Sequence, residues 1–448
     1  MRKILSDYGT IFVLIVLSAF LSWRTMSDQT PEGAEAGRQV AEKIAAMSPR
    51  AARALIAIRD NQVDAQFADA VRSVLEARGI AVAGVVRGSP VEVRRIAKAE
   101  AEQGRFIDAV ASTSATRAWP IFKDIATKIP EMKGVRLVEP ESYRWPTFLK
   151  KDNLINVTNQ SVVITIIAIG MTMVIITGGI ELSVGSLIAL SACLAAWFIR
   201  EWGGGVSAGA GAMVGYSVLA VLLCGIMGLV TGFMVTIFNI PPFIVTLANM
   251  MVASGLAYLI SGGYTIFELP DSYTALGRSS WFWGIPVSVC ICFVLYLAAH
   301  IMMSCTAIGR YIYAVGGNRE AARLSGVPVR FILFFVYVAT ALLAGFGGII
   351  TASQLKAGAP IYGVGYEMFV IAATVVGGTS LAGGEGKIFG TLIGSFIIAA
   401  IQNGMNLMGV ESYTQKVVLG LVILAAVLLD RVKQSEFFWN RRRKTLSA

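Results

Sequence analysis

The stretch VTNQSVVITIIAIGMTMVIIT, residues 157–177, decides the fold class of this chain. It carries no Asp, Glu, Lys or Arg, and about 20 mostly apolar residues suffice to cross the hydrocarbon core of a bilayer as a helix. Comparable stretches lie on both sides of it, at residues 8–27, 184–200, 211–238, 242–260, 284–303, 330–352, 366–382, 387–407 and 414–430. The sequence therefore predicts an all-α polytopic membrane protein with about ten transmembrane helices.

Composition divides the chain into two kinds of segment. Its 448 residues are 55% hydrophobic and 15% charged, with a mean hydropathy of +0.67, whereas a soluble domain carries about 25% charged residues. Half of the 38 Lys/Arg and more than half of the 28 Asp/Glu lie between Asp28 and Lys150. We therefore expect a polar domain within an otherwise membrane-embedded chain.

The polar segment alternates between strand-like and helix-like patterns. The strand patterns lie at residues 53–59, 80–86, 106–112 and 134–138, and the helix patterns at 63–78, 90–103 and 119–129. Such alternation is typical of an α/β unit with a parallel sheet. The predicted organisation is a cytoplasmic N-terminus with the first transmembrane helix (1–27), a small extracytoplasmic α/β domain inserted between helices 1 and 2 (28–145), a membrane core of about nine helices (146–431) and a basic cytoplasmic tail (432–448).

Basic residues predict the orientation of the chain in the membrane. With an even number of spans both termini share one side, and the short loops of that side carry most of the Lys and Arg. Because basic loops stay inside, both termini are expected in the cytoplasm and the α/β domain outside. A cleaved signal peptide is the rival interpretation of the first apolar stretch, but no A-x-A-like site follows it, which favours an uncleaved helix. The net charge of +10 fits this bias better than a nucleic-acid surface, because the basic residues are not interleaved with aromatic ones.

The membrane segments lack the groups that several function classes need. Their acidic residues lie at span ends, which counts against proton-coupled transport, although backbone carbonyls could still bind sodium. A GxxxxGK[ST] loop is absent around Gly386–Lys387, because Leu381 and Ile388 occupy positions that require glycine and Ser/Thr. The five cysteines and the single His300 have no metal-ligand spacing, so we expect no catalytic and no metal-binding residues.

Four segments of the membrane part are more specific than composition. They are Thr177–Ser186 (TGGIELSVGS), Gly316–Val327 (GGNREAARLSGV), Gly377–Gly390 (GGTSLAGGEGKIFG) and Asn403–Asp430 (NGMNLMGVESYTQKVVLGLVILAAVLLD). With these segments the chain resembles the permease subunits of bacterial ABC importers for monosaccharides, of the ribose and xylose type. The resemblance covers Trp145–Asp430 nearly throughout and the first helix, and Glu181 stands where aspartate is usual in that family.

This resemblance implies a function and a set of partners. The chain would be the multi-pass permease subunit that moves a monosaccharide or sugar-like polyol across the bacterial inner (plasma) membrane, paired with a second copy or a paralogue. A cytoplasmic ATP-binding-cassette ATPase would bind ATP and magnesium, so this chain itself would be no enzyme and would bind no cofactor. An extracytoplasmic sugar-binding protein would deliver the substrate. Membrane lipid is an expected partner and nucleic acid is not.

The same resemblance gives a candidate ATPase-coupling loop. Residues 318–326 look like the short helix that docks into the ATPase groove, and an ordinary solvated loop is the alternative. Its ionic members would offer charge, and its alanines and leucine a packing face. The members are Asn318, Arg319, Glu320, Ala321, Ala322, Arg323, Leu324, Ser325 and Gly326.

Candidate residues for gating or for the translocation path lie at the ends of spans. Glu181 is expected to cap the N-terminus of the next helix, where the helix dipole favours an anion, and a gating role together with Ser183 is the alternative. Asn403 and Asn406 are candidates for lining the sugar path, with hydrogen bonding between helices as the alternative.

The insert and the substrate leave alternatives open. Family members usually have a short loop between the first two spans, so residues 28–145 are expected either to contact or partly replace the binding protein, or to be a spacer. Import of a furanose signal, a nucleoside or an amino acid is the nearest alternative to sugar import. A secondary carrier and a membrane receptor are the alternatives from other classes.

Overall fold

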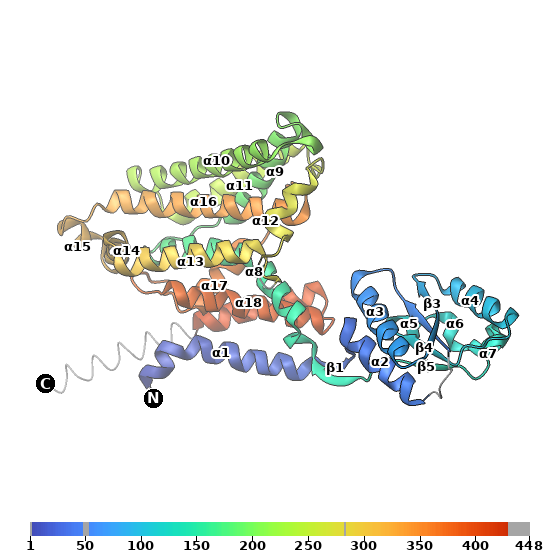
Figure 1. Ribbon diagram of the computed structural model, residues 1–448. Coiled ribbons are helices and arrows are strands. Elements are labelled where there is room, and N and C mark those ends of the chain that lie inside the picture. The colour runs from blue at the N-terminus through green and yellow to red at the C-terminus, as the bar shows by residue number, and fades with distance from the viewer. Residues whose placement is uncertain (1, 48–52, 282–283, 429–448) are drawn as a thin grey trace. The chain divides into compact units, whose positions relative to one another are not determined.

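The computed structural model describes residues 2–47, 53–281 and 284–428 of the chain (Figure 1). The chain divides into two compact units, Met1–Thr25 with Thr147–Ala448, and Met26–Pro146. We call the first the membrane unit and the second the α/β unit.

The membrane unit is a bundle of helices. Seven of the described helices are long and apolar enough to cross a membrane: α8 (Lys151–Ile176), α9 (Val184–Glu201), α10 (Ala210–Ile237), α11 (Pro242–Ser261), α13 (Val287–Cys305), α16 (Val329–Leu355) and α18 (Ile388–Leu407). Three shorter apolar helices accompany them: Gly9–Arg24 within α1 (Arg2–Arg24), α17 (Tyr366–Val376) and Ser412–Leu428. The prediction of a mostly helical, polytopic membrane protein is confirmed, and the number of ten spans stays a prediction.

Short helices connect the long ones. They are η2 (Thr147–Leu149), η3 (Gly205–Ser207), η4 (Asp271–Thr274), α12 (Ala275–Arg278), α14 (Ala307–Gly317) and α15 (Arg319–Leu324). The last two lie between α13 and α16, and α15 lies within residues 318–326, the loop that the sequence assigned to coupling.

Burial distinguishes the central helix of the bundle from the outer ones. α8 contacts α13, α16, α17 and α18, and every side chain from Ser161 to Ile176 is buried. A helix that is apolar all round is stable inside a protein or a membrane. α10, α11 and α13 instead expose apolar side chains, which include Val214, Leu222, Phe243, Met251 and Phe293. Such faces on long helices are typical of contact with lipid.

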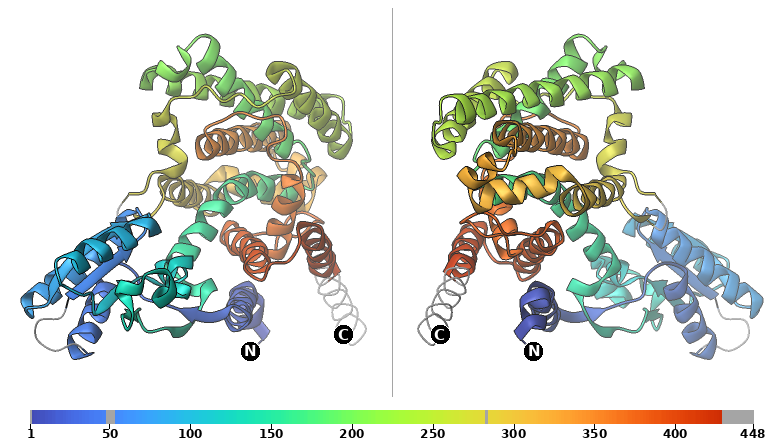
Figure 2. Two further views of the ribbon diagram at one scale, coloured as in Figure 1. Left: turned by 90° about the vertical axis from the view of Figure 1, so that its right-hand side faces the viewer. Right: turned by 90° about the vertical axis from the view of Figure 1, so that its left-hand side faces the viewer.

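The first helix is part of this bundle. α1 packs against α18 (Figures 1 and 2). Leu21 of α1 and Ala400 of α18 are buried together with Phe148 of η2. Thr25 then closes the end of α1, because its backbone oxygen accepts a hydrogen bond from Thr147 N at 2.9 Å. The two chain segments that border the α/β unit are therefore tied to each other within the membrane unit.

One predicted span is wrong in its length. The apolar pattern predicts a helix over residues 366–382, but α17 ends at Val376 and has 11 residues. Gly378 adopts φ = +90°, a left-handed conformation that ends the helix, and Gly377 is packed against the backbone of Gly390. At 1.5 Å per residue, α17 is about half as long as the hydrocarbon core is thick. Residues 377–387 form a glycine-rich loop instead of the end of a span.

The α/β unit contains a parallel four-stranded sheet in the order β3-β2-β4-β5. Its strands are β2 (Arg53–Ile58), β3 (Ala81–Arg87), β4 (Ala109–Ser112) and β5 (Arg136–Val138). Its helices are α2 (Gly33–Met47), α3 (Gln62–Ala77), α4 (Pro90–Glu102), α5 (Ser114–Arg117), α6 (Pro120–Lys123), α7 (Ile125–Lys128) and η1 (Pro130–Met132). A separate antiparallel pair, β1 (Met26–Gln29) with β6 (Tyr143–Pro146), brings the two ends of the unit together.

Both faces of the sheet are covered. α2 and α3 lie on one face of the sheet (Figure 1), where Ile56 of β2 belongs to the same buried cluster as Val40 and Phe67. Leu55 of the same strand packs with Val93 of α4 on the other face. Because successive side chains of a strand point to opposite faces, a strand buried on both sides reads as a continuous apolar run, here RALIAI.

Two features of the α/β unit differ from the sequence pattern. The predicted helix at residues 119–129 is two four-residue helices, α6 and α7, because Asp124 between them has the non-helical angles φ −138° and ψ 58°. α2 has no counterpart among the predicted elements. Its buried face consists mainly of glycine and alanine with Val40 and Ile44, so its apolar periodicity is weak in the sequence.

Candidate functional site

The predicted coupling loop is a capped helix. Asn318 Oδ1 accepts a hydrogen bond from Ala321 N at 2.9 Å and starts α15. After its last turn, Val327 N donates to Ala322 O at 3.0 Å, and Gly326 takes φ = +83°. Both ends of this short helix are therefore fixed by hydrogen bonds within the loop.

The surface of α15 is mostly charged. Arg323 Nε donates to Glu320 Oε2 at 3.1 Å, and this pairing lowers the pKa of Glu320 and raises the pKa of Arg323. Leu324 is 75% exposed, whereas Ala322 is buried within the membrane unit. The predicted packing face is thus divided: Ala322 anchors α15 to its own chain, and Leu324 is exposed beside the charged residues.

The preceding helix meets two other chain segments at one point. Gly316 of α14 lies so close to Ile176 O, at the end of α8, that a Cβ at residue 316 would overlap that oxygen. Gly384 N, from the glycine-rich loop 377–387, donates to the same oxygen at 2.8 Å. Tyr313 of α14 adds a hydrogen bond to Gly386 O at 2.8 Å. We call Ile176, Gly316 and Gly384 the helix-end junction.

Glu181 lies in a buried polar cluster directly after α8. It is 3% exposed, and its Oε1 accepts from Ser183 N at 2.7 Å and from Ser183 Oγ at 2.6 Å. Asn249 Nδ2 of α11 donates to Ser183 Oγ at 3.3 Å and to Thr231 Oγ1 of α10 at 3.1 Å. We call Glu181, Ser183, Thr231 and Asn249 the Glu181 cluster. It ties the loop between α8 and α9 to both α10 and α11.

The role expected for Glu181 is a helix cap, and its geometry is close to that. Ser183 is the N-cap residue of α9, and Glu181 binds the N–H of that residue instead of an N–H inside the helix. Further contacts surround the same loop: Thr246 Oγ1 donates to Ile180 O at 3.2 Å, and the Tyr337 hydroxyl of α16 lies against Gly179. The gating role of Glu181 and Ser183 stays a prediction.

The two candidate path residues differ in environment. Asn403 of α18 is 8% exposed and exchanges two hydrogen bonds with Asn153 of α8, at 2.9 and 3.0 Å. Asn406 is exposed, and its Oδ1 accepts from Gln415 Nε2 at 2.8 Å. Asn403 thus makes the helix–helix hydrogen bonds that were the alternative to a path-lining role, and path lining by either residue remains a prediction.

The variant Asn403→Ala tests this alternative. It should lower the free energy of unfolding of the purified protein by about 1–3 kcal/mol, because the half-buried Asn153 would lose its amide partner. A double-mutant cycle with Asn153→Ala should give a coupling free energy of about 0.5 kcal/mol or more, measured by denaturant unfolding in detergent. Additive effects on stability, together with a raised KM for transport, would instead identify Asn403 as a residue of the path.

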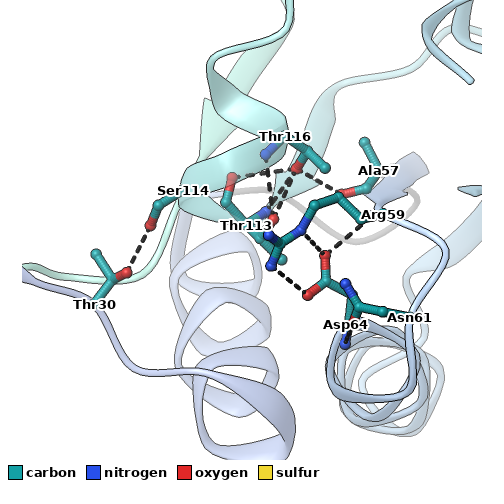
Figure 3. A network of polar contacts seen from close by, with 8 residues as sticks. All are labelled: Thr30, Ala57, Arg59, Asn61, Asp64, Thr113, Ser114 and Thr116. Carbon is teal, nitrogen blue, oxygen red and sulfur yellow. Dashed lines mark hydrogen bonds and ion pairs between the residues drawn. The ribbon is translucent and has the colours of Figure 1, made fainter. Parts of the chain in front are cut away.

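A second polar network lies in the α/β unit and was missed in the sequence. Arg59, directly after β2, forms a paired contact with Asp64 of α3: Nε to Oδ2 at 3.1 Å and Nη2 to Oδ1 at 3.0 Å (Figure 3). Asn61 caps α3 through Oδ1 and Asp64 N at 2.8 Å. Burial acts to raise the pKa of Asp64, but the hydrogen bonds from Arg59 outweigh it and the pKa is lowered. In the sequence, this network corresponds to an RDN-x-x-D pattern at residues 59–64, between a predicted strand and a predicted helix.

Hydroxyl groups of the next strand end lie in the same region. Thr116 Oγ1 donates to Ala57 O of β2 at 2.8 Å, and Thr113 and Thr116 form a capping box at the start of α5 (Figure 3). Ser114 Oγ donates to Thr30 Oγ1 at 2.8 Å, which attaches the segment after β1 to the end of β4. The carboxyl ends of β2 and β4 are thereby held together by side chains.

Comparisons with known proteins place the membrane part among permeases. Residues 153–427 match a family described as "Branched-chain amino acid transport system / permease component". The ribose import permease protein RbsC of Escherichia coli (strain K12) is 43% identical over 295 residues, 64% of this chain and 88% of that protein. RbsC of Bacillus subtilis (strain 168) is 41% identical over 296 residues, 65% of this chain and 88% of that protein.

A third relative belongs to another sugar system. The D-allose transport system permease protein AlsC of Escherichia coli (strain K12) is 35% identical over 285 residues, 64% of this chain and 85% of that protein. No solved structure matches the chain. The family match begins after the α/β unit, Met26–Pro146, so that unit lies outside it.

Proposed function

Because the chain belongs to the family of permease components of branched-chain amino acid transport systems, we propose that it is the membrane-spanning subunit of an ATP-binding-cassette importer for a monosaccharide. The observation that carries this proposal is the 43% identity to a ribose import permease over 88% of that protein. The resemblance predicted from the four sequence segments is confirmed. A branched-chain amino acid is the second candidate substrate, because the family description names it.

The energy source and the partners belong to this proposal. An ATP-binding-cassette ATPase in the cytoplasm would bind ATP and magnesium, and a sugar-binding protein outside would deliver the substrate to a dimer of permease subunits. Both termini would then lie on the cytoplasmic side of the inner membrane, and the α/β unit would be extracytoplasmic. Support comes from the basic loops of the sequence and from the exposed, charged surface of α15.

A contiguous set of contacts leads from α15 into the bundle. α15 follows α14, which meets the end of α8 at the helix-end junction. The next residues after α8 form the Glu181 cluster with α10 and α11. We infer that closure of the ATPases displaces α15 and that this order of contacts carries the displacement to α8, α10 and α11. A packed junction transmits such a shift because its atoms have no free space to absorb it.

Docking through Leu324 is tested by the variant Leu324→Asp. It should abolish co-purification of the ATPase from membranes, since a carboxylate would replace the one exposed large apolar side chain of α15. Val364→Asp is the matched control, because Val364 is 77% exposed and lies after the opposite end of α16. Glu320→Arg should also weaken co-purification, as it reverses one charge of the same surface. An ATPase that stays bound to both α15 variants would contradict docking at this helix.

The substrate is tested in proteoliposomes that contain the chain with its co-purified ATPase. D-ribose, D-allose, L-arabinose and L-leucine are offered in turn, with and without ATP and with the binding protein added. ATP-dependent uptake of one of the sugars is the expected result. Uptake of L-leucine alone would favour the second candidate. Uptake driven by an ion gradient without ATP would identify a secondary carrier, and binding without uptake would identify a receptor.

A further inference from the structure

The α/β unit has the topology of sheets that bind ligands at one edge. The order β3-β2-β4-β5 means that the chain leaves β2 toward β3 and later crosses back to β4, so the connections diverge between β2 and β4. α2 and α3 cover one face and α4 covers the other, as this topology requires. In open parallel sheets, ligands bind outside the carboxyl ends of the strands. The cavity described next lies at the carboxyl ends of β2 and β3, beside the switch point between β2 and β4 and not at it.

A cavity of about 270 Å³ lies at this edge. Its lining comes from the carboxyl ends of β2 and β3 and from the first turn of α3: Ile58, Arg59, Asp60, Asn61, Gln62, Ala65 and Arg87. The two strand ends are held side by side because Gly88 N donates to Ile58 O at 2.9 Å. Sites for drug-sized ligands measure about 300–1,000 Å³, so this cavity suits a smaller molecule.

The charges around the cavity offset one another. Arg59 is paired with Asp64, which is nearly fully buried, and Glu32 acts electrostatically on the same guanidinium. Arg87 and Asp60 bring one further charge of each sign to the lining. Two cations thus face at least two anions, which makes the cavity a poor site for a phosphate or a dicarboxylate. A neutral ligand is not repelled by the anions at the cavity.

The lining offers many hydrogen-bonding groups and a small apolar surface. Exposed guanidinium, carboxylate and amide groups supply planar sets of donors and acceptors. Ala65 supplies a small apolar contact, whereas Ile58 of the lining is 1% exposed and belongs to the core. A small molecule that carries several hydroxyl groups matches this mostly polar lining.

We propose that the α/β unit binds a small neutral polyol of the monosaccharide class in the cavity at the carboxyl ends of β2 and β3. The choice of a monosaccharide rests on the proposed function, whereas the position of the cavity and its neutrality come from the α/β unit alone. The transporter chain then carries a sugar site of its own outside the family's membrane part.

The test is sugar binding to the full chain, purified in lipid nanodiscs and measured by equilibrium dialysis with radiolabelled D-ribose, D-allose and L-arabinose. Arg87→Ala and Gln62→Ala remove lining groups that are exposed and take no part in the Arg59–Asp64 pair. Each should weaken binding of the preferred sugar roughly tenfold, as expected for one lost hydrogen bond to a charged group or a few weaker ones. Arg72→Ala is the matched control, because Arg72 is exposed on α3 roughly 15 Å further along the helix.

Hydrogen exchange of the same samples locates the bound sugar. Protection at residues 58–65 and 86–89 in the wild type, lost in Arg87→Ala and kept in Arg72→Ala, is the expected result. Binding that is equal in the lining variants and the wild type, or protection confined to the membrane helices, would overturn the inference. Inorganic phosphate that binds here and displaces the sugar would overturn the assignment to a neutral ligand.

The experiment can refute the sugar site without refuting the proposed importer function, and the reverse. ATP-driven sugar uptake with no sugar protection in the α/β unit would leave the importer intact and refute the site. Sugar protection of the α/β unit without any associated ATPase would support the site and refute the importer.

Discussion

Replacing Gly316 by alanine is expected to reduce ATP-driven uptake about tenfold or more. The added Cβ would overlap Ile176 O and lie 2.6 Å from Gly384 N, both of them backbone atoms that cannot turn away as a side chain would. Overpacking of a filled site costs about 1–3 kcal/mol, and about 1.4 kcal/mol already changes an equilibrium tenfold. α14 and the end of α8 must therefore separate, and the link between α15 and the bundle loosens. Uptake, ATP hydrolysis and the midpoint of thermal unfolding are measured on the same proteoliposomes.

The neighbouring residue provides the control for this variant. A Cβ at Gly317 would meet no atom within 4 Å, and Gly317 is also the last residue of α14. Gly317→Ala should keep wild-type uptake, since alanine restricts the unfolded chain without a clash. ATP hydrolysis that continues in Gly316→Ala while uptake is lost would locate the defect in coupling. Equal uptake and equal midpoints for the two alanine variants would show that the helix-end junction transmits nothing.

Replacing Glu181 by leucine is the second change with a large expected effect. Ser183 N and Ser183 Oγ would both lose their acceptor in a buried site, at a cost of about 1–3 kcal/mol for each unsatisfied group. Asn249 would then hold a serine that is no longer oriented, so α10 and α11 lose a fixed connection to the loop after α8. Uptake should fall below detection, and the thermal midpoint should drop.

Two further variants separate the role of the carboxylate from the loss of a charge. Glu181→Asp should retain much of the uptake, since a shorter carboxylate still offers an acceptor near Ser183. Glu385→Gln neutralises an exposed acid of the glycine-rich loop and should behave as the wild type. If Glu181→Leu keeps both its midpoint and its uptake, the Glu181 cluster has no part in holding the bundle. A normal midpoint with lost uptake would favour the gating role over the capping role.

Uptake of the preferred sugar in Arg87→Ala, measured beside the dialysis data, tests whether occupancy of the cavity affects transport. Uptake equal to that of the wild type at the same sugar concentrations would show that the two are independent.

The sequence by itself determined the class of the protein and most of its long helices. Uninterrupted apolar runs such as residues 157–177 have one stable environment, because so few charges cannot cover a water-exposed surface of that length. The pattern also located β2, since a strand buried on both faces is a continuous apolar run between polar residues. The loop at residues 318–326 was recognised by resemblance, and its capped helix follows from Asn318 and Gly326, which favour these positions locally.

The tertiary structure alone decided which polar groups meet. Asn153 and Asn403 are 250 positions apart, and Glu181 reaches α10 and α11 through Asn249, so no local pattern could pair them. The end of α17 at Val376 depends on the close approach of Gly377 to Gly390, which an apolar pattern does not register. The cavity beside Arg59 and Arg87 likewise exists because a parallel sheet aligns the ends of two strands that the chain forms separately. Local energies select helices and strands, whereas the meeting of distant side chains is set by how those elements pack.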